Sequence, residues 1–79
     1  MRKPKGKILL HDCGEALYGI RWQTDLARLL GVSDRTVRRW MVDAHEIPAG
    51  VWPELAAALA KRRQLIETVE EFLASSTPL

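Results

Sequence analysis

The stretch QTDLARLLGVSDRTVRRWMV, residues 23–42, decides the expected fold, because its apolar spacing and turn residues predict two helices joined by a short turn. Apolar residues recur at helical spacing up to Leu30, and Gly31 can adopt the left-handed conformation that ends a helix. Ser33 is a strong N-cap residue, so a second helix is expected to start at Asp34. The stretch therefore predicts a helix-turn-helix.

Two small features support a close crossing of these helices. Helices joined by so short a turn approach each other closely, and a large side chain at the crossing would push them apart. Ala27 is small enough to lie at that crossing, and Val32 is an apolar plug in the turn. We therefore expect Ala27 to be a core residue.

The second helix, residues 34–42, is expected to have an apolar side and a cationic side. At about 100° per residue, its apolar side carries Ser33, Val37, Trp40 and Met41, and its other side carries Arg35, Arg38, Arg39 and Val42. Three guanidinium groups without a carboxylate among them suit an anionic partner. The alternative is a charged, solvated face on a small helical domain.

This arrangement predicts contacts with double-stranded DNA. The second helix of a helix-turn-helix enters the major groove with its N-terminal end first, and arginine suits guanine O6 and N7 or phosphate. The side chains expected to touch base edges are Ser33, Asp34, Arg35 and Arg38, and those expected to touch phosphates are Arg21, Gln23, Thr24 and Arg39. Arg28 is expected to pair with Asp25, three residues earlier.

Residues 23–42 resemble the lambda-repressor-like (Cro/cI-type) helix-turn-helix family, through Gln23, Leu26, Ala27, Leu30, Gly31, Val32, Val37 and Trp40. The longer run 16–55 looks like small regulators of phages, prophages and their host genomes, with anti-CRISPR-associated autorepressors as one candidate relative. The resemblance implies operator binding, usually as a homodimer, and commonly repression. Trp22 departs from the family pattern, because many relatives have a Ser or Thr N-cap there.

Length and composition predict one cytoplasmic domain. The chain has 79 residues and a net charge of +2, and its basic residues cluster in 2–7, 21–39 and 61–63. The single cysteine, Cys13, fits a reducing compartment, and the apolar run 8–10 is too short for a signal peptide or membrane span. Residues 1–7 hold four basic residues and predict a flexible basic arm, either on DNA or simply solvated, whereas residues 8–79 form the domain.

The remaining elements follow from local patterns. Asp12 and Glu15 resemble a capping box, so a short helix is expected from Asp12 to about Tyr18. Residues 43–50 are expected to form a loop, and a long helix to start at Trp52 and Pro53. The whole is predicted to be an all-α, compact helix-turn-helix domain of about four helices with a long C-terminal helix.

The C-terminal helix carries more apolar surface than a compact four-helix unit needs. We expect it to form a homodimer interface through Leu65, Ile66, Val69, Phe72 and Leu73. The alternative is that this part folds back onto residues 8–10. Residues 61–63, which are basic, are expected to lie nearer the DNA phosphates.

No residue pattern predicts catalysis, a cofactor, a metal site or a small-molecule effector. His11, Cys13 and His45 lack the spacing of metal ligands, and the two histidines are expected at the surface. The sequence therefore predicts a transcriptional regulator, most plausibly a homodimeric repressor of an inverted-repeat operator. The alternatives are a protein-interaction module, such as an antitoxin-like or anti-immunity adaptor, and an architectural DNA-binding accessory factor of recombination.

Overall fold

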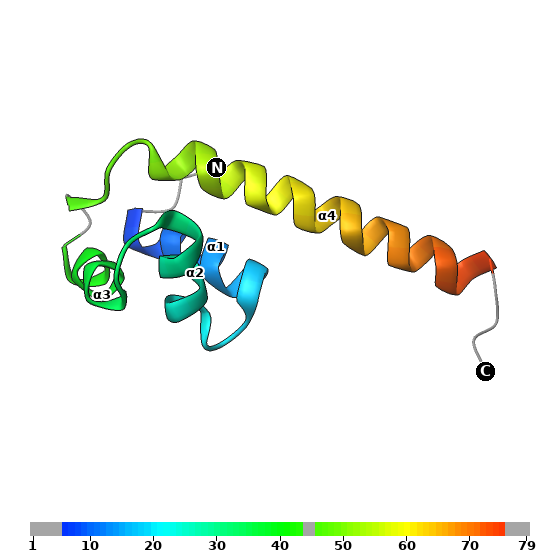
Figure 1. Cartoon of the computed structure of the whole chain (residues 1–79), viewed down its shortest axis with the longest axis horizontal. Coiled ribbons are helices and arrows are strands. Elements are labelled where there is room, and N and C mark those ends of the chain that lie inside the picture. The colour runs from blue at the N-terminus through cyan, green and yellow to red at the C-terminus, as the bar shows by residue number, and fades with distance from the viewer. Residues whose placement is uncertain (1–5, 44–45, 76–79) are drawn as a thin grey trace.

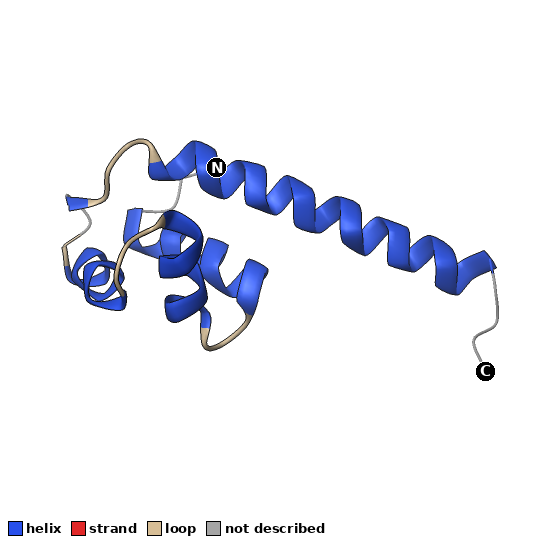
Figure 2. Ribbon diagram, in the orientation of Figure 1, coloured by secondary structure: helices blue, strands red, loops and turns tan. Residues whose placement is uncertain are grey.

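The computed structural model describes residues 6–43 and 46–75. It contains four helices, α1 (Gly6–Tyr18), α2 (Trp22–Leu30), α3 (Asp34–Val42) and α4 (Val51–Ser75). α1 contacts each of the other three helices, and α2 contacts α3. Figures 1 and 2 show a helical body with the long α4 extending away from it. The prediction of an all-α domain of about four helices with a long C-terminal helix is confirmed.

The turn between α2 and α3 has the predicted chemistry. Gly31 takes the left-handed conformation, with φ of 71°, and the backbone N–H of Val32 donates to the carbonyl oxygen of Ala27 at 2.9 Å. The Ser33 hydroxyl accepts a hydrogen bond from the backbone N–H of Thr36 at 3.2 Å. These bonds satisfy backbone groups that the ends of α2 and α3 leave unpaired.

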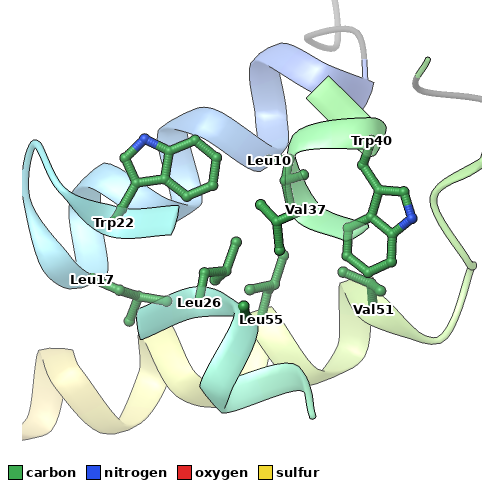
Figure 3. Packing of buried hydrophobic residues seen from close by; sticks show 9 residues of the cluster. Leu10, Leu17, Trp22, Leu26, Val37, Trp40, Val51 and Leu55 are labelled. Carbon is green, nitrogen blue, oxygen red and sulfur yellow. The ribbon is translucent and has the colours of Figure 1, made fainter. Parts of the chain in front are cut away.

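The core lies where the four helices meet. Its buried apolar residues are Leu10, Leu17, Trp22, Leu26, Ala27, Val37, Trp40, Val51 and Leu55. Figure 3 shows Leu26, Val37 and Leu55 together at its centre, with Trp22 and Trp40 towards opposite ends. Ala27, Val37 and Trp40 are therefore core residues, as the helix periodicity predicts.

The predicted start of the first helix at Asp12 is wrong, because α1 begins at Gly6. The buried residues of α1 are Leu10, Gly14 and Leu17, which recur at helical spacing and extend the packed face towards the N-terminus. Gly6 and Lys7 of the predicted arm thus belong to α1, whereas residues 1–5 lie outside the described residues. The predicted end at Tyr18 is correct.

α4 begins one residue before the predicted start, at Val51, and Pro53 lies in its first turn, where the backbone N–H has no helical partner. Only Val51 and Leu55 of this helix are fully buried. Its apolar residues beyond the body are exposed, and α4 continues as a helix to Ser75. The alternative in which this part folds back onto residues 8–10 is therefore wrong for the single chain.

The close crossing of α2 and α3 leads to a stability prediction. Ala27 is 1% exposed, so a larger side chain there has no room without moving a helix. Ala27→Leu is expected to lower the free energy of unfolding by about 1–3 kcal/mol through overpacking. Urea unfolding followed by circular dichroism measures this loss, and an unchanged midpoint would remove Ala27 from the crossing.

Candidate nucleic-acid interface

The outer face of α3 carries the arginines that the sequence analysis assigns to DNA. Arg35, Arg38 and Arg39 are exposed, whereas Val37 and Trp40 are buried on the opposite side of the helix. Among the residues that the structure describes, neither Arg35 nor Arg38 has a hydrogen-bond or ion-pair partner. Both guanidinium groups are therefore available to an anionic ligand.

The N-terminal end of α3 is held by hydrogen bonds within the protein. Ser33 caps the helix, and its hydroxyl also lies 3.1 Å from the Thr36 hydroxyl. The Thr24 hydroxyl donates to a carboxylate oxygen of Asp34 at 2.9 Å, which joins the N-terminal turns of α2 and α3. Three of the predicted DNA-contact side chains, Ser33, Asp34 and Thr24, thus have structural roles in the free protein.

Two further arginines in this region pair with carboxylates. Arg39 Nε lies 3.7 Å from a carboxylate oxygen of Glu46, and both side chains are about half exposed. Such an exposed ion pair contributes little stability, so Arg39 can exchange Glu46 for a phosphate at small cost. Arg28 pairs with Asp25 at 3.5 Å, which confirms that prediction.

The N-terminus of α2 has no side-chain cap. Arg21 is the N-cap residue and makes no capping hydrogen bond, and the buried Trp22 follows it. Because neither residue caps the helix, the first N–H groups of α2 have no capping side-chain acceptor. Arg21 is exposed and Gln23 partly exposed beside them, an arrangement that suits a phosphate.

Arg62 has a role that the sequence analysis missed. Its guanidinium donates a hydrogen bond to the carbonyl oxygen of Leu17, in the last turn of α1. Such carbonyl groups have no partner within their own helix. Arg62 therefore joins α4 to the end of α1 and is not a free basic group near phosphates, whereas Lys61 and Arg63 are exposed.

His11 is partly buried and contacts the aromatic core. Its ring meets that of Trp22 edge to face, with the ring centroids 5.6 Å apart. Its Nε2 lies 2.8 Å from a carboxylate oxygen of Glu15. Glu15 is not part of a capping box, because α1 begins at Gly6 and Asp12 therefore lies inside the helix. The second histidine, His45, lies outside the described residues.

The Cys13 thiol has no features of a reactive group. Partial burial, and to a lesser extent the nearby Asp12 carboxylate, raise the pKa of the Cys13 thiol above its ordinary value. The protonated thiol is a weak nucleophile and a poor metal ligand. In residues 6–43 and 46–75, no three His, Cys, Asp or Glu side chains come together as metal ligands.

Within the same described residues, no helix combines the length and apolar character needed to cross a membrane. Comparison of the chain with protein-family models, curated proteins and solved structures finds no match.

Proposed function

We propose that this protein is a sequence-specific DNA-binding regulator that reads its operator with α3. The observation that carries this proposal is the exposed, unpaired Arg35 and Arg38 on the second helix of a helix-turn-helix. The opposite side of α3 is fixed in the core by Val37 and Trp40. The arginines are thus presented on a rigid element, as base recognition requires.

In the proposed complex, α3 lies in the major groove. Arg35 and Arg38 donate to guanine O6 and N7, with Ser33 and Asp34 at the entering end of the helix. Phosphates on either side are bound by Arg21, Gln23, Thr24 and Arg39. The protein acts as a cytoplasmic homodimer on an inverted-repeat operator and represses the promoter that this operator overlaps.

The test starts from an operator selected from random duplex DNA. Arg35→Ala is expected to weaken specific binding by about 1–3 kcal/mol, because a bidentate contact with guanine is lost. Arg28→Ala is the matched control, since Arg28 is an exposed arginine that lies on α2 and pairs with Asp25. Titration by fluorescence anisotropy measures both affinities, and circular dichroism checks the fold.

Two outcomes bear on the docking. The double variant Arg35→Ala/Arg38→Ala should lose more affinity than either single variant, while its helix content stays that of the wild type. If the double variant bound the selected operator as tightly as wild type, α3 would not be the reading helix.

The exposed apolar half of α4 favours a second function, that of an interaction module for a different protein. Steep salt dependence of DNA affinity would favour the DNA proposal. A single footprint over a promoter would distinguish repression from an architectural role in recombination.

A further inference from the structure

The C-terminal half of α4 carries an apolar stripe that continues the face by which α4 packs on the body. Positions 55, 59, 62, 66, 69 and 73 alternate in steps of four and three, the spacing that keeps one side of a helix against a partner helix. Its first positions pack on the body. Beyond Arg62, the apolar residues at these positions and along one edge of them are 49–68% exposed. They are here called the tail stripe and are Leu65, Ile66, Val69, Phe72 and Leu73.

A groove lies where the body ends and the tail stripe begins. Its volume is about 780 Å³, and it lies between the body residues Leu17, Tyr18 and Leu29 and the α4 residues Ala58 and Leu65. In Figure 1 the C-terminal half of α4 extends beyond the body with no other helix beside it. The groove and the tail stripe are thus continuous, because Leu65 belongs to both.

We propose that a second copy of this chain covers the tail stripe, with the two α4 helices antiparallel about a two-fold axis near residues 67 and 68. This arrangement rests on the homodimer proposed above and specifies its geometry. Ile66 of each copy then packs beside Val69 of the other. Phe72 of each copy reaches Leu65 of the other, at the mouth of the groove.

The charges that flank the tail stripe favour the antiparallel orientation. Arg63 and Glu70 lie seven residues apart, two turns along the same edge of the stripe, whereas Leu65 and Phe72 lie along the other edge. In an antiparallel pair, the charged edge of one helix lies against the charged edge of the other, and the two apolar edges lie against each other. Arg63 of each copy then faces Glu70 of the other, which makes two ion pairs across the dimer.

A parallel pair would have the opposite effect. It would bring the charged edge of one helix against the apolar edge of the other, so Arg63 and Glu70 would face Leu65 and Phe72. The sequence of α4 therefore selects one orientation.

The antiparallel dimer also determines the spacing of the DNA half-sites. The body of each copy packs on the first turns of its own α4, so the bodies lie at opposite ends of the helix pair. At a rise of about 1.5 Å per residue, the two Val51 residues lie roughly 50 Å apart. Because one turn of DNA is about 34 Å, this separation exceeds one turn, so the half-sites should lie more than one turn apart.

Charge exchange tests this arrangement in the absence of DNA. Sedimentation equilibrium should show that Arg63→Glu and Glu70→Arg each raise the dimer dissociation constant about tenfold, because two attractive pairs become repulsive. The double variant Arg63→Glu/Glu70→Arg restores both pairs in the opposite sense and should return the constant to near that of wild type. Glu71→Arg is the control, since Glu71 lies on the side of α4 opposite positions 66, 69 and 73 and does not line the groove.

A cysteine variant tests the orientation independently. In a Cys13→Ser background, the Leu73→Cys residues of an antiparallel dimer are roughly 16 Å apart along the helix axis, too far for a disulfide. No disulfide dimer should form on oxidation. Ready formation of one would show a parallel pair and overturn the proposal.

The proposal is also overturned if wild type is monomeric at micromolar concentration, or if the double variant dimerises no better than the single variants. These results concern α4 alone. The Arg35 and Arg38 variants test DNA binding separately, so failure of the dimer geometry and failure of the proposed function can be told apart.

Discussion

Trp40→Ala is expected to lower the free energy of unfolding by about 3–5 kcal/mol, because a large buried ring is lost and a cavity remains. Trp40 is 4% exposed and projects from α3 towards Val51 at the start of α4 (Figure 3). It therefore links α3 to the start of α4. A 79-residue domain has only a small reserve of stability, so the variant should be partly unfolded at 37 °C.

Trp52→Ala is the matched control, because Trp52 packs against the core but is only partly buried. It should cost clearly less than the Trp40 variant in urea unfolding followed by circular dichroism. Equal losses at the two positions would mean that Trp40 does not anchor α3. A Trp40 variant as stable as wild type would contradict the packing of α3 against α4.

Gly14→Ala is expected to lower the free energy of unfolding by about 3 kcal/mol, although alanine is the better helix former by about 1 kcal/mol. A Cβ at Gly14 would overlap the Trp22 ring, since three ring carbons would lie within 2.8 Å of it. Trp22 is itself buried and packed against His11, so the ring has little room to move. The steric cost should therefore exceed the gain in helix propensity.

Gly50→Ala provides the control, because a Cβ at Gly50 would meet no atom within 4 Å. Its thermal midpoint should stay within a few degrees of wild type, whereas that of Gly14→Ala should fall by more than about 10 °C. A Gly14→Ala protein that is more stable than wild type would show that helix propensity dominates and that α1 does not pack closely on Trp22.

The sequence by itself determined the helix-turn-helix and the phase of α3. Gly31, Ser33 and the spacing of Val37 and Trp40 act within one or two helical turns, and local chemistry of this kind depends little on the rest of the chain. The same periodicity placed Arg35 on the outer face. The exposed arginines of α3 could therefore be predicted from the sequence alone.

Only the tertiary structure decided which polar groups near that site are already paired. Thr24 with Asp34 and Arg39 with Glu46 are pairs between neighbouring elements, and they depend on the angle at which helices cross and on the path of the loop. Helical spacing in a sequence gives neither the crossing angle of two helices nor the path of the loop between them. The hydrogen bond from Arg62 to Leu17 joins residues 45 positions apart and has no local signal at all.

The start of α1 and the direction of α4 were also decided by packing. The local pattern at Asp12 and Glu15 favoured a later start, but burial of Leu10 against the other helices stabilises an earlier one. The periodicity of α4 predicted an apolar stripe. It did not show whether the stripe would pack on residues 8–10 of the same chain or stay exposed. Val51 and Leu55 are buried on the body, Leu59 packs against it and Arg62 bonds to the end of α1, whereas the helix beyond Arg62 extends outward and its tail stripe stays exposed in the single chain.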